Sequence, residues 1–186
     1  MAAVKALRPR VSYADLERAP EDGHRYELYD GEVFVVPAPN LRHQITAQAI
    51  LQVFEDFAAS QGGLVIIAPM DVIFSDYDVV QPDVLFVQAS RAHLMSLTDR
   101  VRHPPDIVVE VLSRRTAATD RGKKMQMFVR YGVPEYWIAD PDARSIEVHG
   151  LRGEAYELRQ LAEADAVVHS IGLSNLSFPA TRAFPF

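Results

Sequence analysis

Two apolar segments that each carry one carboxylate constrain this chain more than any other feature. The first is Asp83 followed by the apolar run 84–87, and the second is the run 107–112 with Glu110 inside it. A continuous apolar run of this kind is typical of a strand that is covered on both faces. An ionised carboxylate there costs several kcal/mol unless a cation or hydrogen-bond donors meet it. The sequence therefore predicts a buried sheet that contains a polar site.

Strand periodicity places both acids on faces that should be apolar. Side chains alternate along a strand, so Asp83 shares a face with Leu85, and Glu110 shares one with Val108 and Leu112. Two such acids suggest a metal-binding or catalytic site. The alternative is a structural ion pair between each acid and an arginine.

A basic stretch at 120–124 supplies a candidate cation. Helical spacing puts Asp120, Lys124, Phe128 and Tyr131 on one face, and the two aromatic residues should be buried. Lys124 is therefore drawn toward the core, where an anion should meet it, whereas Lys123 faces a more exposed side. The alternative is that Lys124 lies over apolar surface and extends its ammonium group into water.

Two further candidates lie earlier in the chain. Glu27 belongs to a predicted hairpin around Asp30-Gly31, and it either reaches the same cleft or remains a carboxylate on the rim. His43 lies one turn into the first long helix, and a lone helical histidine is more typical of a surface or core position than of a catalytic one. The sequence contains no glycine-rich phosphate loop, serine elbow or His-x-x-x-His motif.

The order of predicted elements indicates a mixed α/β domain in which helices flank a central sheet. A short helix begins at Ser12, and the Asp30-Gly31 hairpin follows it. We expect longer helices over 41–60, 90–97 and 119–131, a turn at 76–78, and strands at 64–68, 71–74, 84–87, 107–112 and 135–138. A hairpin over 146–158 and an edge strand or docked tail complete the chain. The predicted organisation is a tail over 1–11 and a single domain over 12–186.

Composition excludes several classes of protein. The chain has no cysteine, so disulfides, zinc–thiolate sites and cysteine nucleophiles are excluded. It has neither an apolar run of about 18 residues, as a membrane span needs, nor a signal peptide at its start, so we expect a cytoplasmic protein with no membrane partner.

The charge distribution bears on a nucleic-acid partner. The net charge of −6 argues against one. Residues 91–130 nevertheless hold nine Lys and Arg against four Asp and Glu, around the candidate site. The alternative is that these basic residues form a solvated helix face.

Several motifs, in this order and spacing, resemble those of the PD-(D/E)XK nuclease superfamily. Within it, the segments 27–32, 80–83, 109–113, 120–124 and 132–138 resemble the Uma-two family of restriction endonuclease-like proteins. The resemblance covers about residues 12–150. It implies a restriction-endonuclease-like α+β fold, with a central mixed sheet flanked by helices.

The resemblance also implies a chemistry. Asp83 and Glu110 would hold Mg²⁺ or Mn²⁺, Lys124 would take the role of the superfamily lysine, and Glu27 would be an accessory acid. The implied function is a metal-dependent endonuclease that hydrolyses DNA phosphodiester bonds, and fold-level analogy adds a possible homodimer. One position departs from the superfamily: Leu112 stands where the Glu-x-Lys motif has its lysine, and a lysine from the next helix can reach the same point.

Two other interpretations stay open at this point. A catalytically silent module of the same fold would bind nucleic acid or protein, which the acidic net charge and the missing Glu-x-Lys motif favour. A purely structural domain would pair its acids with Arg114, Arg115 or Arg121.

Overall fold

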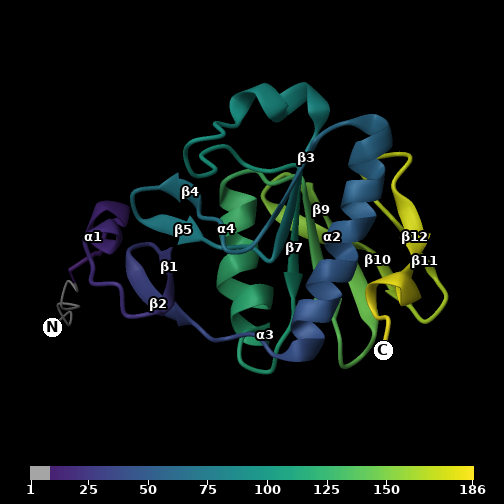
Figure 1. The fold of residues 1–186 in the computed structure, drawn as a ribbon, viewed down its shortest axis with the longest axis horizontal. Helices are drawn as coiled ribbons and strands as arrows, with labels where there is room; N and C mark the ends of the chain where they lie inside the picture. The colour runs from purple at the N-terminus through teal and green to yellow at the C-terminus, as the bar shows by residue number, and fades with distance from the viewer. Residues whose placement is uncertain (1–8) are drawn as a thin grey trace, which may run out of the picture.

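A six-stranded sheet forms the centre of the molecule in the computed structural model, which describes residues 9–186 (Figure 1). Its strand order is β10-β9-β8-β7-β6-β3. Strands β7 and β8 run parallel, and the other neighbours are antiparallel. The six strands are β3 (Leu64–Ile67), β6 (Val84–Val87), β7 (Ile107–Val111), β8 (Glu135–Asp140), β9 (Ser145–Arg152) and β10 (Ala155–Glu163). The predicted mixed α+β class is confirmed.

A smaller sheet lies beside the first, on the left of Figure 1. Its order is β2-β1-β5-β4, and its strands are β1 (Arg25–Tyr29), β2 (Glu32–Val36), β4 (Val72–Ser75) and β5 (Asp78–Val80). Asp30 and Gly31 form the predicted hairpin turn, both with positive φ (52° and 78°). The prediction of a turn as far as Asp78 was wrong, because Asp78 already begins β5 and pairs with Ser75.

Helices cover the two faces of the central sheet. On one face, α2 (Leu41–Gln61) packs its apolar side on alternate residues of β6, β7 and β8, and Asn40 caps its first turn as predicted. The opposite face carries one continuous helical segment, which comprises α3 (Ala117–Thr119), a π turn (Asp120–Lys124) and α4 (Met125–Arg130). This layering explains the continuous apolar runs in β6 and β7, since both faces of these strands are buried.

The remaining elements are short. Helix α1 (Tyr13–Glu17) starts with a capping box of Ser12 and Asp15. The helix expected over 90–97 is a 3-10 helix, η1 (Ala89–Leu94). The C-terminal β11 (Val167–His169), β12 (Ser177–Pro179) and η3 (Ala180–Ala183) dock against the α2 face of the core, as expected for the tail.

The start of the chain was expected to be a tail over 1–11. Residues 1–8 of it lie outside the described part. The backbone N–H of Val11 donates to the carbonyl of Gly31 at 2.9 Å, and Arg10 donates to the carbonyl of Asp30 at the same distance. The single domain over 12–186 stays a prediction. No helix within residues 9–186 has the length and apolar character needed to cross a membrane.

Phe54 is the aromatic centre of the contact between α2 and the sheet. It is fully buried, and its ring lies 5.3 Å from that of Trp137 and 5.8 Å from that of Phe86. We expect Phe54→Ala to lower the free energy of unfolding by about 3–5 kcal/mol in urea titrations, because it leaves a cavity in a packed core. Leu97→Ala is the control, since this side chain is 93% exposed, and its effect should stay within about 0.5 kcal/mol. A small effect of Phe54→Ala would contradict the assignment of this core.

Candidate active site

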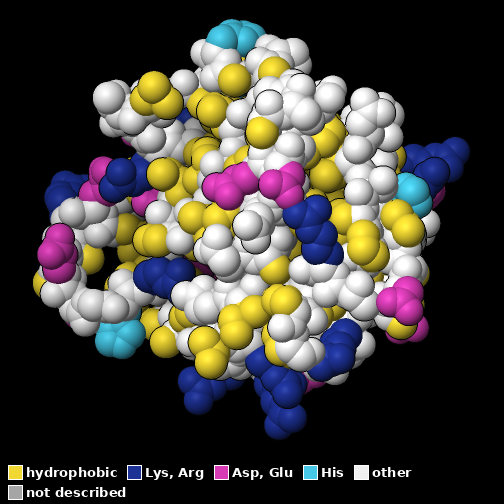
Figure 2. All heavy atoms as spheres, turned by 45° about the vertical axis from the view of Figure 1, so that its right-hand side comes forward, with side chains coloured by type: hydrophobic (Ala, Val, Ile, Leu, Met, Phe, Trp, Pro, Cys, Tyr) yellow, Lys and Arg dark blue, Asp and Glu magenta, His cyan; other side chains and the backbone are white. Residues whose placement is uncertain are grey.

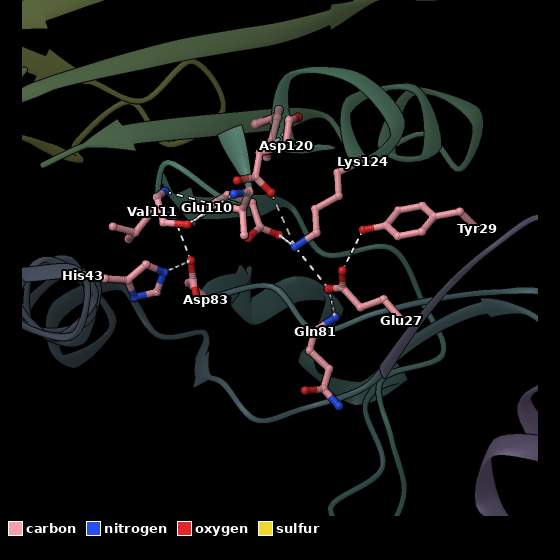
Figure 3. A network of polar contacts seen from close by, with 12 residues as sticks. Glu27, Tyr29, His43, Gln81, Asp83, Glu110, Val111, Asp120 and Lys124 are labelled. Carbon is pink, nitrogen blue, oxygen red and sulfur yellow. Dashed lines mark hydrogen bonds and ion pairs between the residues drawn. The ribbon is translucent and has the colours of Figure 1, made fainter. Parts of the chain in front are cut away.

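The ammonium group of Lys124 lies at the centre of a buried cluster of carboxylates (Figure 3). Its Nζ atom is 2.9 Å from Oε1 of Glu110, 3.1 Å from Oε1 of Glu27 and 3.7 Å from Oδ1 of Asp120. Only 6% of the Lys124 side chain is exposed. The ammonium group has therefore exchanged water for carboxylate oxygens, and the alternative in which it extends into solvent is wrong.

A π turn over Asp120–Lys124 places this lysine. The turn buries Asp120 and Lys124, whereas Lys123 is exposed, lies over the ring of Phe34 and pairs with Glu32 at 2.8 Å. The inward orientation of Lys124 and the outward one of Lys123 agree with the helical spacing. The helix expected over 119–131 is confirmed as a continuous helical segment over 117–130, and its first part is a π turn, which is wider than an α-helical one. π turns inside helices are frequent at functional sites.

Glu27 links the smaller sheet to the cluster. Its Oε1 accepts the backbone N–H of Gln81 at 2.9 Å, and its Oε2 accepts the hydroxyl of Tyr29 at 2.7 Å. These two donors and Lys124 satisfy both oxygens of a carboxylate that is almost fully buried. Glu27 is thus part of the cluster, and the alternative of a rim carboxylate is wrong.

Asp83 lies next to Glu110, on the side of the cluster away from Glu27 (Figure 3). Its Oδ2 accepts the backbone N–H of Val111 at 2.8 Å and lies 3.1 Å from Nε2 of His43. The bond to Val111, the residue after Glu110, fixes the two acids side by side at the ends of neighbouring strands. His43 reaches Asp83 from α2, on the other face of the sheet.

The sequence did not assign roles to His43 and Asp120, yet both belong to this cluster. His43 was expected to be an ordinary surface or core residue, and nothing near it in the sequence indicates that it meets Asp83. Asp120 was placed on the face of Lys124, four residues before it, and that spacing is the signal that could have identified it. Oδ1 of Asp120 and Nδ1 of His43 are buried and have no hydrogen-bond partner in the described chain.

The arginines that were candidates for structural ion pairs lie elsewhere. Arg121 binds Glu147 at 2.6 Å, and Arg114 lies 3.9 Å from Asp142. Arg115 forms no ion pair with any residue in 9–186. The acids of the cluster are met by a lysine and a histidine instead, so the alternative in which they pair with arginine is wrong.

Burial controls the protonation of the cluster. It raises the pKa of Glu110 well above its ordinary value, and the charge of Lys124 only partly offsets this, while Asp83 and Asp120 raise it further. Burial also raises the pKa of Asp120. For Lys124, burial lowers the pKa, but Glu110 and Glu27 outweigh it and raise that pKa well above normal. Lys124 therefore stays charged at neutral pH, and Glu110 takes up a proton more readily than an exposed glutamate.

The residue types of the cluster fit a hard divalent cation. Mg²⁺ prefers oxygen ligands and is usually bound through one or two carboxylates and several waters. Asp83 and Glu110 supply two carboxylates side by side, and Oδ1 of Asp120 has only the Lys124 ammonium group near it. No group of three or more His, Cys, Asp or Glu within 9–186 has the arrangement of a complete metal site. A cation here would therefore depend on two or three carboxylates together with water or substrate.

Comparison with known proteins identifies the family and the fold of the chain. The sequence model of the Uma2 family, described as "Putative restriction endonuclease", matches residues 12–181. A crystal structure described as a "putative nuclease belonging to DUF820", from Anabaena variabilis ATCC 29413, superposes with a TM-score of 0.78 at 18% identity, over 94% of this chain and 98% of that one. At this identity the likeness shows the fold, and it confirms the predicted fold class. No curated protein matches the chain.

Glu110→Gln should reveal the cost of ionising Glu110 in the metal-free protein. Because the pKa of Glu110 is raised above 4.5 in the folded state, the unfolded chain loses this proton at lower pH. From pH 4.5 upward the folded state then binds more protons, so the free energy of unfolding falls as the pH rises. We expect urea titrations in EDTA to show that the free energy of unfolding falls more steeply with rising pH for the wild type than for Glu110→Gln.

The control for this experiment is Glu163→Gln, which changes an exposed glutamate on β10. Its stability should follow the wild type across the same pH range. Parallel curves for the wild type and Glu110→Gln would show that Glu110 carries no raised pKa.

Proposed function

The chain belongs to the Uma2 family, and on that premise we propose that it is a metal-dependent endonuclease that hydrolyses DNA phosphodiester bonds. The observation that carries this proposal is the Lys124 ammonium group, buried between Glu110 and Glu27 and close to Asp83. Each buried charge costs several kcal/mol unless it is compensated. A module that only binds a partner has no need to bury three acids, Glu27, Glu110 and Asp120, beside one lysine, whereas phosphodiester hydrolysis uses such groups.

Asp83 and Glu110 would hold the cation, Mg²⁺ or Mn²⁺, with Asp120 available as a third carboxylate. When bound, the cation supplies an acidified water and compensates negative charge on the phosphate. The bond from Val111 N–H to one oxygen of Asp83 leaves the other oxygen of that carboxylate for a ligand. Hydrolysis then consists of in-line attack by water on phosphorus, with a new P–O bond formed as the bond to the leaving oxygen breaks.

Lys124 and Glu27 would act on the phosphate side of this reaction. The Lys124 ammonium group stabilises the negative charge that grows on the phosphoryl oxygens, and it can also orient the attacking water. Glu27 fixes the position of Lys124 and is itself held by Gln81 and Tyr29. The high pKa of Lys124 keeps it cationic throughout the neutral range.

His43 would orient Asp83. With its proton on Nε2, the imidazole donates to Oδ2 of Asp83, the same oxygen that Val111 binds. Groups that hold a metal-binding residue in this way typically change metal affinity or activity by about 10–100-fold when they are mutated. This role also accounts for a histidine buried on α2 next to the ends of two strands.

A catalytically silent module of the same fold is the second candidate function. It is favoured by the fact that Lys124 already neutralises Glu110 and Glu27, while residues 9–186 present no group of three metal ligands. Such a module would bind DNA or protein without cutting.

The homodimer and the cytoplasmic location also stay predictions. Light scattering on the purified protein tests whether it forms a homodimer.

Plasmid cleavage tests the proposed reaction. We expect the wild type to nick or cut supercoiled DNA with Mg²⁺ or Mn²⁺ and to be inactive in EDTA. Glu110→Ala should abolish cutting, and Lys124→Ala should lower the rate about 100-fold or more, because the charge near the phosphate is lost. The assay is the conversion of supercoiled plasmid on agarose gels.

Lys123→Ala is the matched control, because it removes the neighbouring lysine, which is exposed and bound to Glu32. It should cut like the wild type. Either a wild type that leaves plasmid intact or a Lys124→Ala variant that cuts at full rate would refute the endonuclease.

Metal binding separates the two candidate functions without any DNA. Calorimetric titration with Mn²⁺ should show a site that is lost in Asp83→Asn and weakened about 10-fold in His43→Ala. Gln48→Ala, one turn further along α2 and exposed, should bind like the wild type. If the wild type takes up no Mn²⁺, the silent module is the better description.

A further inference from the structure

Arg25 and Arg115 line the hollow beside Asp83 and have no ion-pair or hydrogen-bond partner among residues 9–186. We propose that Arg25 and Arg115 bind the phosphate backbone of DNA and guide it over Asp83. This inference rests on the proposed function and specifies which surface receives the substrate.

Arg25 and Arg115 differ from the other Lys and Arg residues of the described chain in their lack of a partner. Every Lys and Arg between 91 and 130 except Arg115 pairs with an Asp or Glu. In the rest of the described chain, Arg25, Arg10 and Arg144 have no acidic partner, but Arg10 and Arg144 donate to the carbonyls of Asp30 and Phe186. Arg25 and Arg115 are thus the two cationic side chains of residues 9–186 that have neither an ion pair nor a hydrogen bond.

Both free arginines line the same hollow. It is an open depression of about 600 Å³, and its lining includes His43 and Asp83. Only 15% of the Asp83 side chain and 11% of the His43 side chain are exposed, so the hollow reaches down to the edge of the cluster. A ligand in this hollow therefore lies next to both arginines and to the exposed edge of Asp83.

A second hollow extends the first along one edge of the molecule. It measures about 500 Å³ and shares Arg115 and the stretch 37–39 with the first. It adds Arg42 and Arg114, which both pair with Asp142 in the same lining. Figure 2 shows Lys and Arg side chains gathered along the lower edge, where Figure 1 places α3 and the start of α2. The first turn of α2 contains no acidic residue, so the positive end of its helix dipole adds to the same potential.

This distribution of charge is suited to binding an extended polyanion such as DNA. The net charge of −6 and the buried acids would repel DNA from most of the surface. A Lys or Arg that already pairs with an Asp or Glu gains little free energy by binding a phosphate, because the existing ion pair must first be broken. Arg25 and Arg115 would give up no partner among residues 9–186, and the planar guanidinium group of arginine fits phosphate oxygens in bidentate geometry. The two residues come from different parts of the fold, Arg25 from the start of β1 and Arg115 from the loop between β7 and α3.

The test measures DNA binding apart from catalysis. Fluorescence anisotropy with a short labelled duplex is recorded in EDTA over a series of salt concentrations. For the wild type, the logarithm of the binding constant should fall linearly with the logarithm of salt concentration. Arg25→Ala and Arg115→Ala should each weaken binding and reduce that slope by about 1, and the double variant by about 2.

Arg152→Ala is the control, because this exposed arginine on β9 lies away from both hollows and pairs with Glu157. It should leave the slope unchanged. Thermal unfolding of all variants shows whether they are folded. Since Arg25 and Arg115 are solvent-accessible and unpaired, their replacement should not alter the unfolding temperature.

The outcomes keep this proposal distinct from the proposed function. Unchanged slopes in both variants would overturn the role of Arg25 and Arg115, even if the wild type cuts plasmid. Reduced slopes would support it even if the wild type proves to be silent. Equal competition by a poly-glutamate peptide of the same charge would overturn the assignment to phosphate.

Discussion

The burial of a single ammonium group, that of Lys124, governs how the two sheets meet. Glu27 comes from the smaller sheet and Glu110 from the central one, and without a cation between them their charges would repel each other in a region with little water. Breaking a buried ion pair by removing one partner typically costs about 3–5 kcal/mol, because the remaining charge is left uncompensated. The packing of the smaller sheet against the central sheet therefore depends on the same group that the proposed chemistry requires.

The cluster joins structural and chemical demands that oppose each other. Lys124 pairs with both Glu110 and Glu27 and offsets part of the cost of burying them, yet Glu110 would also have to bind a cation in the proposed reaction. Asp83 lies outside this competition, since its partners are His43 and the backbone of Val111. In the proposed reaction, Asp83 would therefore offer the more accessible carboxylate, and Glu110 would share its charge between Lys124 and the cation.

Local signals in the sequence were enough for much of the fold and for the centre of the site. The Asp30-Gly31 turn and the Asn40 cap are short-range features, and alternation along the strands together with helical spacing selected Glu110 and Lys124. The pairing of His43 with Asp83 could not be predicted, because it joins a helix to a strand end forty positions later and depends on how α2 packs. The π turn and β5 are likewise set by tertiary packing. Charge counts showed an excess of cations over 91–130, but only the structure shows that nearly all of them are paired.

The residues of the cluster come from distant parts of the sequence, and this affects how the chain folds. The Lys124 ammonium group meets Glu110 through a short loop, but it meets Glu27 only after nearly the whole first half of the domain has been brought back to it. Contacts of such long sequence separation carry a loop-closure cost, which slows folding. Until these contacts form, the acids and the lysine remain hydrated, and no burial cost arises. The burial cost of the charged centre therefore arises when the smaller sheet packs against the central one, together with the apolar contacts between the two sheets.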